Sequence, residues 1–210
     1  MPSPAMIGRT EFQNVSGTRC PTDFVELPSI LMEKFLTHAD SLALIARHHQ
    51  TERPLAMEDL QRHLGASTSF ADLETHDELM LSLLDQRLHS IPSESNNIDS
   101  TRLYEDVQKT SSILEPILGL DWQGRFSHLV SYPATYYAYP LDRALSTAIW
   151  EDSFASSPLS EKLGRAYKQR LLSHGGAREP RDSLIDFASS TPSASGRNRV
   201  LDLLTDLQPE

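Results

Sequence analysis

Apolar side chains recur every three or four residues along most of this chain, which is the spacing of amphipathic α-helices. The strongest example begins at Phe70 and ends at Leu88. The alternation with a period of two that is typical of strands is not convincing anywhere. The pattern therefore predicts a mostly α-helical protein, with helices over residues 22–35, 38–49, 55–64, 70–88, 100–114, 134–154, 157–173 and 199–207.

Proline and glycine mark the expected ends and interruptions of these helices. Pro28 lacks an N–H donor, so it must lie in the first turn of its helix or kink that helix. Gly65 is expected to end the third helix as a C-terminal cap. Pro140 is expected to interrupt or kink the helix that contains it.

The chain is long enough for one domain, or one and a half, with a sizeable core. Residues 119–132 contain two glycines and are expected to form an ordered loop. Residues 188–197 are rich in Ser, Pro and Gly, which is typical of a linker. We therefore expect a main part over residues 1–187, followed over residues 188–210 by this linker and a weak terminal helix.

The composition argues against several classes of protein. The net charge is −10, from 29 acidic and 19 basic residues, and no basic stripe suggests nucleic-acid binding. No apolar run approaches the roughly 18–20 residues of a membrane span. Cys20 is the single cysteine, so a disulfide within the chain is excluded. Residues 1–6 resemble neither a signal peptide nor an Arg-rich transit peptide, and no targeting segment is expected in this chain.

A carboxylate at the start of the first predicted helix is the first candidate for chemistry. The stretch Ser16–Ser29, with the sequence SGTRCPTDFVELPS, places Glu26 three residues after Asp23. This spacing is typical of a helix N-terminal cap, and carboxylates are common near helix N-termini. On these residues alone, a capping role, a solvent-facing role and a role as a metal ligand all stay open.

The second candidate is an aromatic stretch. Residues Phe126–Tyr139, with the sequence FSHLVSYPATYYAY, hold four tyrosines and one histidine. One interpretation makes Tyr136, Tyr137 and Tyr139 core aromatics whose hydroxyls lie at a polar edge. The other makes them hydrogen-bond donors of a binding or catalytic site.

Taken together, the two stretches resemble the thimet oligopeptidase family of zinc metallopeptidases. The resemblance covers most of residues 6–187 and is dense over residues 8–36 and 119–153. It implies that the chain is the C-terminal part of a helical, thimet-oligopeptidase-like (zincin) catalytic domain. Residues 175–180, with the sequence GGAREP, also resemble a C-terminal signature of the family, although a helix C-cap followed by a turn is sufficient to explain them.

The resemblance also implies individual roles. Glu26 matches the family's zinc-binding glutamate, so zinc is the implied cofactor and Glu26 is one of its three protein ligands. His128, Tyr136 and Tyr139 match residues that hydrogen-bond the scissile carbonyl and the oxyanion formed on water attack, with Tyr139 as the preferred donor. Tyr132 matches a tyrosine that contacts the substrate.

Within the family, the sequences of both stretches most resemble those of the members that trim peptides from imported precursor proteins in the mitochondrial matrix. The implied activity is that of a metalloendopeptidase, and the implied partner is a peptide or precursor-protein substrate. No nucleic acid and no membrane span are expected. The oligomeric state is not indicated.

The family's H-E-x-x-H motif is absent from all 210 residues. In the family, its second histidine precedes the zinc-binding glutamate by about 25 residues, and counting back from Glu26 leads to Met1. The motif helix is therefore expected to lie before the chain begins. No two of the eight histidines are four apart on one helix face, so a rebuilt zinc site is not expected. A truncated or mispredicted gene model is the simplest explanation, and the chain is then expected to be inactive alone.

Two other classes stay open. One is a non-catalytic helical module, a pseudoenzyme that binds peptides or a partner subunit through the tyrosine-lined surface. The other is a non-functional remnant. Two departures from the family pattern bear on this choice, because Ser131 and Pro133 replace a more glycine-rich run and Pro140 falls in an expected helix interior. Less hinge freedom impairs closure over a substrate.

Overall fold

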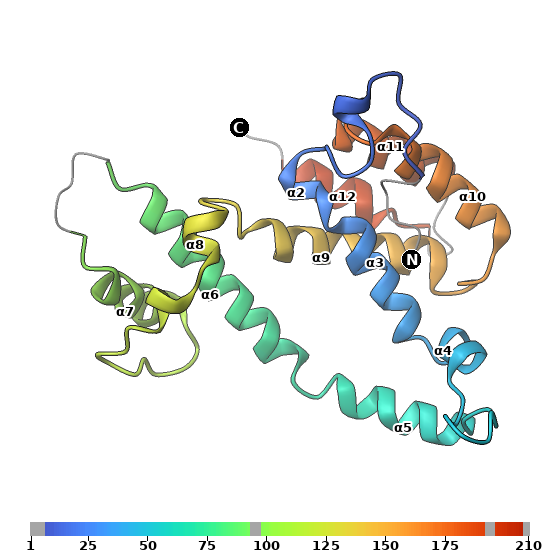
Figure 1. Ribbon diagram of the computed structural model, residues 1–210, viewed down its shortest axis with the longest axis horizontal. Helices are drawn as coiled ribbons and strands as arrows, with labels where there is room; N and C mark the ends of the chain where they lie inside the picture. The colour runs from blue at the N-terminus through green and yellow to red at the C-terminus, as the bar shows by residue number, and fades with distance from the viewer. Residues whose placement is uncertain (1–6, 93–97, 192–195, 208–210) are drawn as a thin grey trace. The chain divides into compact units, whose positions relative to one another are not determined.

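The computed structural model describes residues 7–92, 98–191 and 196–207 (Figure 1). Within these ranges there is no β-strand, and an isolated antiparallel bridge joins Arg47 and Pro54. The mostly α prediction is confirmed. In chain order the elements are η1 (Gln13–Val15), α2 (Thr22–Val25), α3 (Leu27–Leu36), α4 (Ala39–Ile45), α5 (Met57–Ser67), α6 (Ala71–His89), α7 (Ser100–Ser111), η2 (Trp122–Arg125), α8 (His128–Ser131), α9 (Ala138–Ile149), the π-helical turn η3 (Trp150–Phe154), α10 (Glu161–Arg170), η4 (Leu172–His174), α11 (Pro180–Ser190) and α12 (Arg199–Asp206).

Contacts divide the chain into two compact units. The first combines residues up to 67 with those from 142 onward, and the second comprises residues 68–141, so that the boundary falls within α9. The expected division at residue 187 stays a prediction, and positions 192–195 and 208–210 of its C-terminal segment lie outside the described residues. None of the described helices has the length and apolar character needed to cross a membrane.

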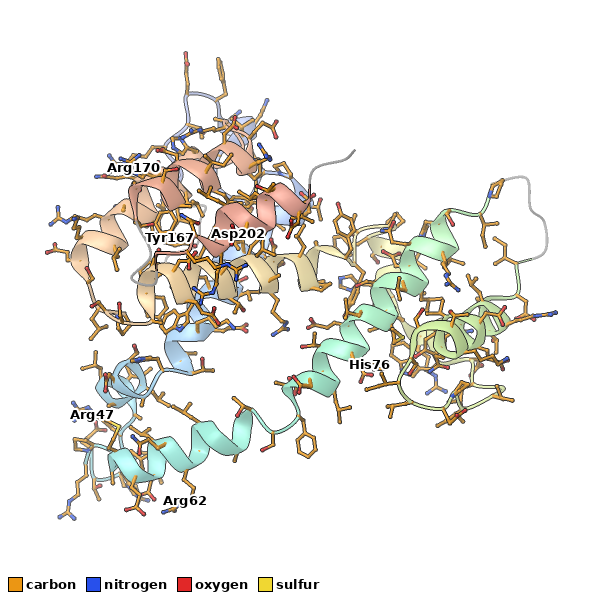
Figure 2. The ribbon with its side chains drawn as sticks, turned by 180° about the vertical axis from the view of Figure 1, so that it is seen from behind. Arg47, Arg62, His76, Tyr167, Arg170 and Asp202 are labelled. Carbon is orange, nitrogen blue, oxygen red and sulfur yellow. The ribbon has the colours of Figure 1, made fainter. Side chains whose placement is uncertain are left out.

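The first unit has an aromatic core between its C-terminal helices. Phe187 on α11 is fully buried, and its ring centroid lies 6.5 Å from that of Phe154 and 5.9 Å from that of Tyr167 on α10. At the edge of this core, Arg170 (Figure 2) forms an ion pair with Asp186, which joins α10 to α11. Other fully buried apolar residues of the unit are Leu27, Leu31, Leu60, Ile149, Leu171 and Val200.

The C-terminal helix α12 packs against α11 and belongs to this core. Val200 and Leu204 are buried. The carboxylate of Asp152 accepts hydrogen bonds from the backbone N–H of Arg199 at 2.7 Å and from its guanidinium at 2.9 Å. Asp152 therefore satisfies a backbone donor that the first turn of a helix leaves without an intrahelical partner.

Two consecutive glycines allow close packing in the first unit. Gly175 follows η4 with φ of 50°, a conformation that favours glycine. A Cβ atom on Gly176 would lie 2.1 Å from the carbonyl oxygen of Arg19, and the Gly176 N–H donates to the carbonyl of Val15 at 2.8 Å. The pair thus ends a helical segment and lets the N-terminal region pack directly against it.

The proline and glycine predictions have mixed outcomes. Pro28 lies in the first turn of α3, because α2 ends at Val25 and a new helix begins at Leu27. Gly65 lies inside α5, so its expected cap is wrong; glycine costs only about 1 kcal/mol in a helix interior. Pro140 lies in the first turn of α9, which begins at Ala138 and not near residue 134, so no intrahelical hydrogen bond is lost there.

The second unit is built around the pair α6 and α7. His76 on α6 (Figure 2) accepts hydrogen bonds at 3.2 Å from the Ser112 hydroxyl and from the Ile113 N–H, which fixes the end of α7. The expected ordered loop that follows contains two short helices, η2 and α8. The buried apolar residues of this unit are Met80, Leu84, Val107, Leu129 and Ala138.

Candidate functional site

Glu26 lies at the junction between α2 and α3. It is the N-cap residue of α3, but its side chain makes no capping hydrogen bond, so the capping interpretation is not supported. Its carboxylate accepts a hydrogen bond from the Ser29 hydroxyl at 2.9 Å, and Ser29 also donates to the Glu26 carbonyl at 2.8 Å. Ser29 therefore restrains the orientation of a half-buried carboxylate.

A second carboxylate, Asp142 on α9, holds the backbone of this junction. It is fully buried and accepts a hydrogen bond from the Glu26 N–H at 3.2 Å. Burial raises the pKa of Asp142 to about 7, against hydrogen bonds from the Glu26 and Leu27 backbone that lower it, while the nearby charges of Asp23 and Glu26 raise it further. Sequence reasoning missed Asp142, because its partner lies 116 positions away.

The residues around Glu26 do not make a complete zinc site. A catalytic zinc ion takes three protein ligands from His, Cys, Asp or Glu. No group of three such side chains with a suitable arrangement occurs in the described part of the chain. Glu26 supplies one carboxylate, and Oδ2 of the buried Asp142 accepts the Glu26 N–H. The role of Glu26 as a metal ligand stays a prediction.

The second candidate region forms an aromatic cluster around His128, the first residue of α8. The imidazole stacks on Phe126 with ring centroids 5.6 Å apart and an interplanar angle of 16°. Tyr132, Tyr136 and Tyr139 surround the same imidazole, with ring centroids at 5.1, 5.3 and 5.7 Å. The structure therefore brings together all four residues that the sequence selected in this stretch. We call these four the His128 cluster.

The His128 cluster is accessible from solvent. Tyr132 is 56% exposed, and the other three members are half-buried. The hydroxyl of Tyr139 lies 3.4 Å from Nε2 of His128, near the upper limit for a hydrogen bond. A neutral phenol and an imidazole converge here without deep burial, which favours a site that donates hydrogen bonds over an internal core. The individual catalytic and substrate-binding roles stay predictions.

The tyrosine-bearing loop, residues 132–137 between α8 and α9, carries Tyr132 and Tyr136 and is attached to α6 by its backbone. Asp85, which is 1% exposed, accepts hydrogen bonds from the N–H groups of Ala134 at 3.1 Å and of Tyr136 at 2.9 Å. The neighbouring Gln86 side chain donates to the carbonyl of Ala134 at 2.9 Å. Sequence reasoning did not select Asp85, because an isolated aspartate in an amphipathic helix gives no signal of a partner about 50 positions away.

The sequence model of Peptidase family M3 matches residues 5–202. The chain therefore belongs to this family of peptidases, as the resemblance to thimet oligopeptidases predicted. The helical fold class is consistent with this membership. Zinc dependence is a general property of the family, and it is the family alone that connects this chain with zinc.

Several curated relatives carry a more specific name. Mitochondrial intermediate peptidase of Malassezia globosa is 44% identical over 200 residues, which cover 95% of this chain and 25% of that protein. Mitochondrial intermediate peptidase 1 of Cryptococcus neoformans is 40% identical over 95% of this chain and 29% of that protein. The Yarrowia lipolytica mitochondrial intermediate peptidase is 38% identical, over 94% and 26% respectively. The chain thus spans about a quarter of the length of the curated relatives that it matches.

Proposed function

We propose that this chain is part of the catalytic domain of a zinc-dependent metalloendopeptidase of the mitochondrial intermediate peptidase type. The observation that carries the proposal is the His128 cluster, a solvent-accessible set of hydrogen-bond donors in a chain that matches Peptidase family M3 over residues 5–202. The substrate is a peptide or precursor protein. The location is mitochondrial, with the matrix as the specific compartment, in keeping with the names of the relatives.

The His128 cluster binds the reacting peptide bond in this proposal. When water attacks a peptide carbonyl, negative charge develops on the carbonyl oxygen, and fixed donors aimed at that oxygen lower the barrier. The Tyr139 hydroxyl is the main donor, because a phenol donates without carrying a charge. Tyr136 and His128 support it from ring contacts at 5.1 and 5.7 Å, while exposed Tyr132 contacts the substrate chain.

Glu26 supplies one metal ligand in this proposal. The Ser29 hydroxyl and the hydrogen bond from the Glu26 N–H to Asp142 hold it in one orientation, as hydrogen-bonded neighbours do for ligands in metal sites. The remaining ligands are not supplied by the described residues. We therefore expect that the 210-residue chain alone is inactive.

The isolated chain is expected to hold no stoichiometric zinc and to cleave no peptide, because one carboxylate does not provide the three protein ligands of a catalytic site. Zinc content after equilibrium dialysis and hydrolysis of a fluorogenic peptide check this. Tight binding of one equivalent of zinc, lost in the Glu26→Gln variant, contradicts it. If the chain binds peptides without cleaving them in any context, the non-catalytic peptide-binding module is the better explanation.

A positive test uses a chimeric protein, in which this chain replaces the aligned 200 residues of the Malassezia globosa relative. The rest of that relative then supplies the metal ligands that the described residues of this chain do not provide. Peptide cleavage by the chimera supports the proposal. A chimera that folds and holds zinc but cleaves nothing contradicts it.

A further inference from the structure

We infer that Asp85 is a positioning residue, which fixes the tyrosine-bearing loop and thereby the geometry of the His128 cluster. This inference rests on the proposed function, because the importance of the loop comes from the hydrogen bonds its tyrosines donate. The geometry that supports it lies entirely within the second unit of the structure, residues 68–141. It involves neither Glu26 nor a metal.

Asp85 is the buried charged residue at the base of the loop, and its partners account for its burial. Its two carboxylate oxygens are divided between the N–H groups of Ala134 and Tyr136, at 3.1 and 2.9 Å. The imidazole Nδ1 of His89, one turn further along α6, lies 2.9 Å from the same carboxylate. Hydrogen bonds to an ionised acceptor are about twice as strong as those between neutral groups.

The backbone of the loop needs such an anchor at Ala134. This residue has φ of 59°, in the left-handed region where glycine is favoured and where other residues are held at a cost. Both of its backbone polar groups are bound by α6, the N–H by Asp85 and the carbonyl by Gln86. A strained residue persists only where its surroundings over-determine it, and here two consecutive side chains of one helix do so.

The anchor is transmitted directly to the cluster. Tyr136, whose N–H is the second donor to Asp85, places its ring edge-on to Phe126 at 5.0 Å and to His128 at 5.3 Å. The Tyr139 N–H then donates to the Tyr136 carbonyl at 3.2 Å, which continues the chain into α9. Without Asp85, the Tyr136 N–H loses its hydrogen bond, and the positions of the rings around His128 are no longer fixed.

The test compares Asp85→Asn with wild type in the full 210-residue chain, by amide hydrogen exchange and by NMR shifts of the His128 ring protons. Asparagine keeps one acceptor oxygen but replaces the other with a donor, so one loop N–H loses its partner. We expect exchange at Tyr136 to be about 10- to 100-fold faster, from the loss of a charge-assisted hydrogen bond. The His128 ring protons should move toward unstructured values.

Two controls separate positioning from general destabilisation. Asp77→Asn makes the same substitution on α6 at a side chain that is 76% exposed, and it should change neither readout. Val107→Ala removes methyl groups at a fully buried position and should lower the melting temperature without selective change at Tyr136 or His128. Asp85→Glu should retain part of the exchange protection that Asp85→Asn loses, because glutamate keeps the charge and both acceptor oxygens.

If Asp85→Asn does not fold, Gln86→Ala carries the test. Gln86 is exposed, and this substitution removes only the hydrogen bond to the Ala134 carbonyl, which is the second anchor of that residue. Unchanged exchange at Tyr136 and unchanged His128 shifts in these variants overturn the inference. The readouts use no substrate, so the inference can fail while the chimera cleaves peptides. Conversely, it can hold while the chimera is inactive, in which case the proposed function alone fails.

Discussion

Replacing Tyr139 by Phe in the chimeric protein is expected to lower kcat by about 10²- to 10³-fold, the usual effect of removing one oxyanion donor. The hydroxyl is lost, but the ring can keep its contacts with His128 at 5.7 Å and with Tyr136 at 5.1 Å. KM should change little, because the hydrogen bond strengthens mainly as charge develops on the carbonyl oxygen. Steady-state hydrolysis of a fluorogenic peptide measures both constants.

A matched control for this substitution is available in the same unit. Tyr104 on α7 is half-buried and packs against Trp122 with ring centroids 6.3 Å apart, outside the His128 cluster. Tyr104→Phe removes the same hydroxyl and should leave kcat essentially unchanged. A kcat for Tyr139→Phe that equals that of Tyr104→Phe contradicts the assignment of Tyr139 as the oxyanion donor.

The stability of the isolated chain is expected to fall as the pH rises through neutrality, because of Asp142. The folded protein holds a proton on Asp142 up to a pKa of about 7, whereas the ordinary value for an unfolded chain is 3.8. Between these values the folded state binds more protons than the unfolded state, so the free energy of unfolding decreases with increasing pH. The stabilisation is complete below the unfolded value and is lost as the pH rises through the folded one. The shift in pKa corresponds to about 4 kcal/mol.

Urea unfolding of wild type and of Asp142→Asn, at about pH 4.5 and about pH 8.5, isolates this effect from other titrating groups. Asparagine is neutral at both pH values, so the free energy of unfolding of the variant should increase relative to that of wild type as the pH rises. Asp40→Asn, at an exposed position of the same unit, should show a constant difference from wild type. A difference between wild type and Asp142→Asn that does not change with pH contradicts the prediction.

Local signals in the sequence were sufficient for most of the longer helices and for the composition of the aromatic cluster. The 3.6-residue pattern located α3, α6, α7 and α10 or much of their length but not α11, and the density of aromatic residues singled out the stretch that holds the His128 cluster. The choice between a first-turn proline and a kink at Pro28 needed the structure. It depends on where the helix that contains Pro28 begins, and the structure places that start directly after Glu26.

The supporting carboxylates could not be predicted from the sequence. Asp85 and Asp142 bind backbone N–H groups that lie 49 and 116 positions away, and neither belongs to a motif. Ala134 was also unpredictable, because alanine gives no indication of a left-handed backbone conformation. In each of these cases the cause is tertiary: a helix-borne side chain satisfies the backbone of a segment that is distant in sequence.

The most direct test of the proposed peptidase role is the zinc content of the chimeric protein and of its Glu26→Gln variant, measured by mass spectrometry after dialysis. The chimera should hold about one zinc ion per chain, and Glu26→Gln should hold far less, because a neutral amide is a poor zinc ligand. Glu33→Gln, at an exposed position of α3, serves as the control and should retain the ion. Full zinc content and full activity in Glu26→Gln would contradict the role proposed for this carboxylate.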